Sequence, residues 1–224
     1  MTADPRTRQI GRSTPAGGRR RLAEARREEM LRRLLEMFLA EGFSSLTVEE
    51  IASRLRCSKS TLYAVAPGKD QLVAAAMKCF FREATTYVED SVARVEDPRD
   101  RIAVYLASIG DRMRQMSPAC YSDMTASETA GMIYQLNARA SARRVRELIH
   151  EGVKAKMLRP VHAEFVAESV GLLIDGIMHG QLLERTGLSS GDAYHELSTL
   201  VLQAMAIDGD RRASRPTRSD LPAT

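Results

Sequence analysis

Tryptophan is absent from the sequence, and aromatic residues make up only 5% of it. Strands favour aromatic and β-branched side chains, whereas this chain is rich in alanine, leucine, arginine and glutamate, which favour helices. We find no alternation of apolar and polar residues typical of strands, and no internal repeat. The composition therefore predicts an all-α protein, and a hydrophobic content of 44% is enough for a buried core.

Cysteines are few, and the three present, Cys57, Cys79 and Cys120, have no zinc or redox spacing. This usage predicts a reduced, cytoplasmic protein. The basic N-terminus is not followed by the apolar segment of a secretory signal. The longest apolar stretch, residues 163–184, is interrupted by charged residues and does not reach the roughly 18 apolar residues of a membrane span. We therefore expect no membrane association.

Catalytic motifs are also missing, since the sequence has no glycine-rich phosphate loop, no G-x-S-x-G and no H-E-x-x-H. We therefore expect a protein that is not an enzyme, without catalytic residues, bound metal or cofactor. The net charge of +4 is mild, but the first 27 residues hold eight arginines against two acidic residues. Such a distribution is compatible with a nucleic-acid partner.

Residues 1–21 contain almost nothing to bury and are expected to be a disordered basic arm. Two interpretations stay open for this arm: a solvated tail, or a segment that contacts DNA phosphates or enters a minor groove. Residues 208–224 are likewise expected to be a disordered tail. The folded part is predicted to comprise residues 22–68 and 69–207.

The stretch from Thr47 to Lys69 is the most informative part of the chain. Thr47 and Glu50 have the spacing of a capping box, which predicts a helix start. Ser58 can cap a second short helix after a tight turn, and Pro67 with Gly68 ends it. With a preceding helix over residues 22–41, this arrangement predicts a helix-turn-helix DNA-binding domain.

Apolar periodicity predicts six further helices, which gives about nine in all. Pro98 suits the first turn of one of them. These helices would form a second domain, and their predicted ranges are 69–95, 99–115, 117–124, 125–156, 162–185 and 190–205.

Residues 34–77, LLEMFLAEGFSSLTVEEIASRLRCSKSTLYAVAPGKDQLVAAAM, resemble the N-terminal domain of the TetR family of bacterial transcriptional regulators. Residues 151–177 resemble the C-terminal domain of many members. The resemblance implies an all-helical homodimer that binds palindromic double-stranded operator DNA. It further implies a repressor whose DNA binding is relieved by a small apolar effector in the C-terminal domain, with dimerisation through helices at 162–185 and 190–206.

Matching positions in the family motif imply which residues contact DNA. Hydroxyl groups and lysines at the ends of helices suit phosphate oxygens, while short side chains on the second helix reach base edges. The implied DNA-binding residues are Thr47, Ser58, Lys59, Ser60, Thr61, Tyr63 and Lys69.

The chain departs from the family pattern after Tyr63. Ala64, Val65 and Ala66 stand where the family usually has aromatic or histidine residues, and Gly68 stands where a capping serine is common. We expect these changes to loosen the recognition helix and weaken DNA binding. An alternative function follows: a helical ligand-binding or partner-binding protein with a degenerate DNA-binding head.

Candidate ligand contacts lie on the helices that would enclose the implied pocket. Asp175 and His179 share a helix face at i, i+4, and they could contact a ligand or form a buried pair at a dimer interface. Methionine side chains adapt to varied apolar ligands, although they are often plain core residues. The candidates are Tyr105, Met113, Met116, Met124, Met132, Tyr134, Asp175, Met178 and His179.

Overall fold

The structure of the chain is a computed structural model, and it describes residues 15–207. Within that range the chain forms ten α-helices and no strand. The all-α prediction is therefore confirmed. The parts of the two predicted disordered segments that cover residues 1–14 and 208–224 lie outside the described residues.

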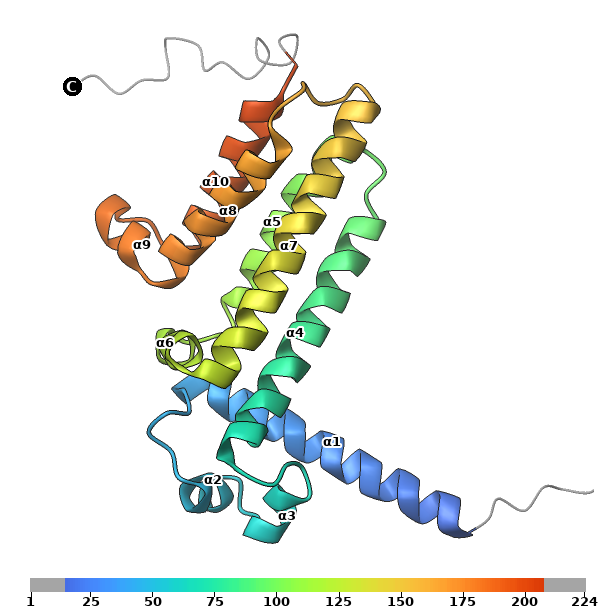
Figure 1. Ribbon diagram of the computed structural model, residues 1–224, viewed down its shortest axis with the longest axis vertical. Coiled ribbons are helices and arrows are strands. Elements are labelled where there is room, and N and C mark those ends of the chain that lie inside the picture. Colours follow the sequence, from blue (N-terminus) through green and yellow to red (C-terminus); the bar gives the residue numbers. More distant parts are fainter. Residues whose placement is uncertain (1–14, 208–224) are drawn as a thin grey trace, which may run out of the picture.

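The first helix, α1 (Pro15–Glu41), is longer than the sequence analysis predicted. Residues 15–21, assigned there to a disordered arm, continue the helix N-terminally. Proline is favoured in a first helical turn, and Ala16 and the arginines at 19–21 are good helix formers, although Gly17 and Gly18 are not. The absence of residues to bury therefore did not prevent helix formation, and α1 extends beyond the rest of the N-terminal domain (Figure 1).

The N-terminal domain consists of α1, α2 (Val48–Arg54) and α3 (Lys59–Tyr63). Leu34 and Phe38 on α1, Ile51 on α2 and Leu62 on α3 have no exposed surface. The Phe38 ring also packs on Phe43, with ring centroids 5.5 Å apart. The short helices α2 and α3 are therefore held against α1 by one shared apolar core.

The C-terminal domain is an elongated bundle in which α4 continues upward from the N-terminal domain beside α5 and α7 (Figure 1). The helix α8 packs against α7 and α10 packs against α5, on the side away from α4, and α6 lies at the junction of the two domains. The bounds are α4 (Lys69–Ala93), α5 (Pro98–Met113), α6 (Pro118–Ala126), α7 (Glu128–Lys154), α8 (Ala163–Met178), α9 (Gln181–Thr186) and α10 (Ser190–Met205).

The predicted helix over residues 162–185 is divided into α8 and α9. Gly180 adopts a positive φ of 77°, a left-handed conformation that ends an α-helix and that glycine adopts easily. The remaining helices were predicted with their ends correct to within a few residues. The helix α7 begins after Ser127, whose hydroxyl accepts from Ala130 N, rather than at Thr125.

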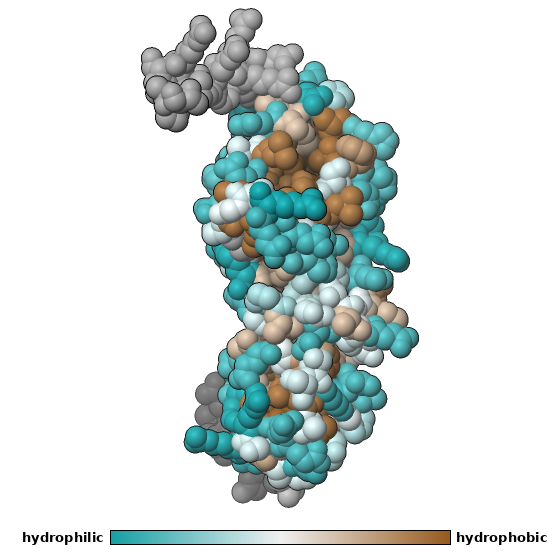
Figure 2. Space-filling model, turned by 90° about the vertical axis from the view of Figure 1, so that its left-hand side faces the viewer, coloured by the Kyte–Doolittle hydropathy of each residue, from teal (hydrophilic) through white to brown (hydrophobic). Residues whose placement is uncertain are grey.

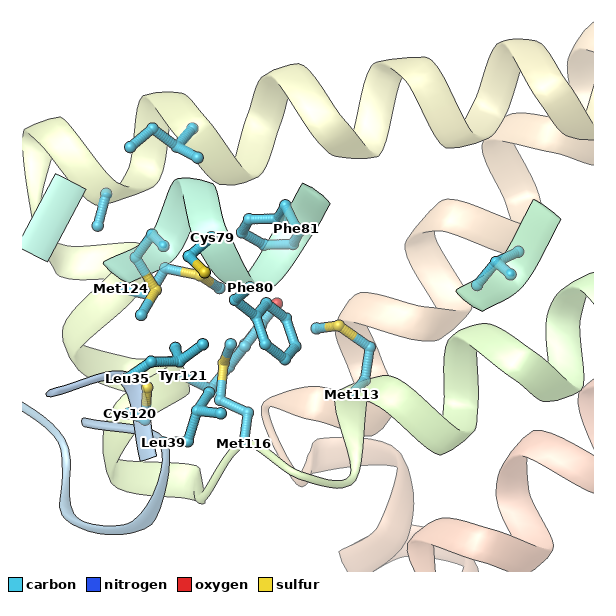
Figure 3. Close-up of a cluster of buried hydrophobic side chains, with 14 of the residues drawn as sticks. Leu35, Leu39, Cys79, Phe80, Phe81, Met113, Met116, Cys120, Tyr121 and Met124 are labelled. Carbon is cyan, nitrogen blue, oxygen red and sulfur yellow. The ribbon is translucent and has the colours of Figure 1, made fainter. Parts of the chain in front are cut away.

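The two domains share a continuous hydrophobic core at their junction. Figure 3 shows Leu35 and Leu39 of α1 beside Phe80 of α4, with Cys120 and Tyr121 of α6 in the same cluster. All five side chains are buried. Through these side chains the close-packed core is continuous between α1, α4 and α6.

Candidate nucleic-acid interface and ligand cavity

The start of α2 has the capping box that the sequence predicts. Glu50 N donates to Thr47 Oγ1 at 3.2 Å, and Thr47 N donates to Glu50 Oε2 at 2.7 Å. The hydrogen bonds that Glu50 accepts from Thr47 hold the pKa of the Glu50 carboxyl below its usual value. Thr47 is exposed at this helix N-terminus, where backbone N–H groups favour an anion.

The helix α3 presents the predicted base-contacting residues on one exposed surface. Ser58 is its N-cap, with its hydroxyl accepting from Thr61 N at 3.2 Å. Leu62 anchors the helix in the core, while the side chains on the remaining positions are exposed, and Lys59 forms an ion pair with Glu49 of α2. The exposed residues are Ser58, Lys59, Ser60, Thr61 and Tyr63.

The residues that follow α3 make contacts that the sequence analysis did not identify. Val65 and Ala66 are buried, and Arg27 of α1 donates a hydrogen bond from Nη2 to Val65 O at 2.9 Å. Arg33 donates likewise to Leu55 O at the end of α2, at 2.6 Å. Two arginines of α1 thus satisfy carbonyl groups at the ends of both short helices, where a positive charge is favourable.

Lys69, at the start of α4, is partly buried and donates from Nζ to Ser44 O at 2.7 Å. The Lys69 amine, predicted to contact a phosphate, is therefore hydrogen-bonded within the chain in this structure. Ser44 lies in the turn between α1 and α2, so Lys69 joins that turn to α4.

The same turn is bound to α6. The Asp123 carboxylate accepts hydrogen bonds from Phe43 N at 2.6 Å, Ser44 N at 2.8 Å and Ser44 Oγ at 2.6 Å. Burial alone would raise the pKa of Asp123, but these hydrogen bonds and the charge of Lys69 bring it below its usual value. We call this set of hydrogen bonds the Asp123 contact.

A cavity of about 540 Å³ lies in the C-terminal domain between α4, α5, α7 and α8. Its walls are mainly apolar, and its size is typical of small-molecule sites. Of the nine predicted ligand contacts, four line it: Tyr105, Met113, Tyr134 and Asp175.

The other five predicted contacts lie elsewhere. Met116 and Met124 are buried in the junction core, and Met132 is exposed on α7. Met178 and His179, at the end of α8, are not among the lining residues. Apolar spacing in the sequence does not tell which face of a helix borders the cavity, and Met116 lies in the connection between α5 and α6 rather than on a helix.

Asp175 is joined to two tyrosines from other helices. Its Oδ1 accepts hydrogen bonds from the hydroxyls of Tyr121 on α6, at 2.9 Å, and Tyr134 on α7, and the two hydroxyl oxygens are 3.1 Å apart. Burial raises the pKa of both tyrosines, and the hydrogen-bonded Asp175 raises it further. The phenols therefore remain protonated donors.

His179 does not pair with the Asp175 carboxylate as the i, i+4 spacing suggested. Its Nδ1 lies 2.9 Å from the Asp175 backbone oxygen, and its ring packs edge-on against Tyr121. The described residues contain no group of three or more histidine, cysteine or acidic side chains that could hold a metal ion. No helix in residues 15–207 is long and apolar enough to cross a membrane.

An apolar surface covers α8 and α10 on the face away from α4. Phe165 and Leu172 of α8 are exposed by 71% and 73%, and Leu200 of α10 by 58%. Figure 2 shows apolar side chains gathered in the upper half of this face. Large exposed apolar side chains gathered on one face are typical of interaction surfaces.

A helix-turn-helix domain joined through α4 and α6 to a helical domain with an apolar cavity defines an all-helical DNA-binding protein with a candidate small-molecule site. Residues 31–76 match the family model described as bacterial regulatory proteins, tetR family. The helix-turn-helix domain of this chain is thus of the tetR type, and the fold of the described residues is TetR-like. A search of curated proteins found no matching sequence.

Solved structures show the same fold over most of the chain. A transcriptional regulator from Saccharomonospora viridis, in complex with choline, has a TM-score of 0.69 at 19% identity, covering 83% of this chain and 99% of that one. A TetR-family regulator from Cytophaga hutchinsonii has a TM-score of 0.68 at 13% identity, covering 83% and 97%. One from Agrobacterium tumefaciens has 0.66 at 13% identity, covering 83% and 100%.

Proposed function

We propose that the protein is a homodimeric repressor that binds a palindromic operator through α2 and α3 and is released by a small, largely apolar effector in the cavity. The observation that carries this proposal is the position of α6. Tyr121 on α6 contacts Asp175 at the cavity, and Asp123, two residues later, binds the turn that precedes α2. A ligand that moves α6 would therefore change the position of the DNA-binding helices.

The proposed DNA contacts are the hydroxyl and lysine side chains of the two short helices. Lys59 is ion-paired with Glu49 and Lys69 is hydrogen-bonded to Ser44 O in this structure. Both contacts are exposed or partly exposed, so each lysine can exchange its partner for a phosphate or a base at little cost. Contacts with phosphates supply affinity, and contacts with base edges supply sequence preference.

The proposed dimer forms through the apolar surface of α8 and α10. Its exposed side chains, Phe165, Leu172 and Leu200, lie within the ranges 162–185 and 190–206 that the family resemblance implies. Two-fold symmetry of such a dimer would place two recognition helices on a palindromic site. The relative from S. viridis in complex with choline favours binding of small molecules among proteins of this fold.

The test is a gel-shift titration of the full chain on the DNA upstream of its own gene, at two salt concentrations. We expect specific, salt-sensitive binding. Lys69→Ala should weaken binding to all sequences, Lys59→Ala should alter site preference, and Lys78→Ala, an exposed lysine elsewhere on α4, should do neither. Salt-insensitive binding, or no binding to any upstream fragment, would instead support a ligand-binding protein with a degenerate head.

A further inference from the structure

Arg112 on α5 is the one charged residue of the cavity wall that is largely buried yet donates no hydrogen bond within the described residues. Its side chain is 19% exposed, and its Nε is buried without a partner. Arg112 forms an ion pair with Glu83, whose Oε2 lies 3.9 Å from Arg112 Nη2, but this distance is beyond that of a hydrogen bond. A guanidinium group has five N–H donors, and leaving the buried Nε–H among them without a partner is costly.

Aromatic rings hold the Arg112 guanidinium in place. Its Cζ lies 5.8 Å from the centroid of the Phe80 ring and 5.7 Å from that of Tyr87, both on α4. Cation–π contacts of this kind fix the position of an arginine but satisfy none of its donors. The group is therefore positioned in advance and keeps its capacity to bind an acceptor.

The two half-buried acidic groups of the cavity wall already have partners, and the other two, Glu147 and Glu168, are exposed. Glu89 binds Arg144, with Oε1 3.1 Å from Nε, and Asp175 accepts hydrogen bonds from two tyrosines. Neither acid is in contact with Arg112. An incoming cation would have to compete with these partners, whereas an incoming anion finds the donors of Arg112 unused.

Most of the exposed surface of the cavity wall is apolar. It is formed by side chains of α4, α5, α7 and α8 that offer no charge and no hydrogen bond to a ligand, including Val88, Leu106, Ile109, Met113, Val170 and Ile174. A molecule that fills the cavity therefore buries a hydrocarbon body against these residues.

We propose that the effector is an amphipathic organic anion, with an apolar body along this wall and a carboxylate bound by the Arg112 guanidinium. An arginine and a carboxylate form charge-assisted hydrogen bonds, frequently two in parallel, and these are stronger in an apolar surrounding than in water. The proposal rests on the proposed function in taking the cavity as the effector site, and it adds the chemical class of the effector.

The first experiment compares three probes of equal chain length on the full wild-type protein by isothermal titration calorimetry. Octanoate should bind about tenfold or more tightly than octan-1-ol, since only the carboxylate completes the hydrogen bonds of Arg112. Octyltrimethylammonium should bind most weakly. Tighter binding of the ammonium probe than of octanoate, or no binding of any probe, would overturn the proposal.

The second experiment tests Arg112 itself. Arg112→Gln should lose the preference for octanoate and bind octan-1-ol as the wild type does, while Arg112→Lys should keep part of the preference because it keeps the charge. Arg143→Gln is the matched control, because Arg143 also borders the cavity but is exposed. Equal behaviour of Arg112→Gln and Arg143→Gln would overturn the proposal. If Arg112→Gln does not fold, the ranking of the three probe affinities on the wild-type protein decides whether the proposal stands.

A gel shift in the presence of octanoate separates this proposal from the proposed function. If octanoate binds through Arg112 and leaves the operator complex intact, the ligand class stands and relief of DNA binding fails. If another compound releases the DNA while octanoate shows no preference over octan-1-ol, the proposed function stands and the ligand class fails.

Discussion

Gly42 and Asp123 approach each other so closely that a β-carbon on Gly42 would lie 2.5 Å from Asp123 Oδ2. Gly42 also has a φ of 82°, a left-handed conformation that ends α1 and turns the chain towards α2. The absence of a side chain thus serves two purposes here. It permits the turn, and it lets the Asp123 carboxylate reach Phe43 N and Ser44 N.

Gly42→Ala should therefore destabilise the protein by more than backbone strain alone. Strain at a positive φ costs about 1 kcal/mol or more, and displacement of Asp123 adds the loss of its hydrogen bonds. Gly180→Ala is the control, because Gly180 has a similar φ of 77° and nothing within 4 Å of the added β-carbon. Urea unfolding should show a clearly larger loss for Gly42→Ala. Equal losses would mean that the close approach to Asp123 has no energetic consequence.

Asp123→Asn should weaken the attachment of α6 to the turn before α2. The amide carries no charge and accepts hydrogen bonds more weakly than a carboxylate, so we expect a loss of about 1–3 kcal/mol in the free energy of unfolding. Ligand affinity should change little, while the ligand concentration needed to release DNA should rise. Asp90→Asn, at an exposed position of α4, serves as control. If release of DNA by ligand is unchanged in Asp123→Asn, the signal does not pass through this contact.

Acid should break the Asp123 contact in the wild type. The pKa of Asp123 is lower in the folded protein than its ordinary value of 3.8, so the folded state binds this proton less readily than the unfolded chain does. Asp123 therefore adds stability above the unfolded-state pKa and loses it as the pH falls through the lower, folded-state value. The difference in urea midpoint between wild type and Asp123→Asn should shrink below about pH 4. A constant difference down to pH 3 would contradict this assignment, since the amide of the variant cannot titrate.

Local sequence patterns predicted most of the fold but little of the way its parts meet. The capping box of Thr47 and Glu50, and the serine cap at Ser58, are formed within three or four residues, so their spacing in the sequence was sufficient. The Asp123 contact joins residues 79 and 80 positions apart. No periodicity encodes such a pair, because it depends on how α6 packs against α1.

The cavity illustrates the same limit. Tyr134 and Asp175 were predicted as ligand contacts and line the cavity, but Arg112 was not considered. An arginine in an amphipathic helix is usually solvated, and only the packing of Phe80 and Tyr87 around it shows that it is partly buried. The sequence likewise did not predict the hydrogen bond that Arg27 of α1 donates to Val65 O, because the two residues are 38 positions apart. The expectation that Ala64, Val65 and Ala66 weaken DNA binding stays a prediction.

Arg27→Gln should weaken binding to the operator although Arg27 is not itself a proposed DNA contact. Its hydrogen bond to Val65 O fixes the end of α3, and losing that bond leaves a partly buried carbonyl unsatisfied at a cost of about 1–2 kcal/mol. Arg26→Gln removes the same charge from an exposed neighbour. Gel-shift titrations should show a larger loss of affinity for Arg27→Gln. Identical losses would indicate that only the positive charge of α1 matters.

Leu172→Glu should convert the proposed dimer into monomers. Leu172 on α8 is 73% exposed in the single chain, and in a dimer through α8 and α10 it would be removed from water. A buried, unpaired carboxylate at that position costs several kcal/mol on each side of a two-fold interface, which exceeds what the surrounding apolar contacts can offset.

The control is Leu136→Glu, on α7 and 65% exposed, which introduces the same charge outside the proposed interface. Sedimentation equilibrium should give a monomer mass for Leu172→Glu and a dimer mass for wild type and Leu136→Glu. Operator affinity should fall together with dimerisation, because a monomer presents only one recognition helix to a palindrome. If the Leu172→Glu variant is still a dimer, the surface of α8 and α10 is not the interface.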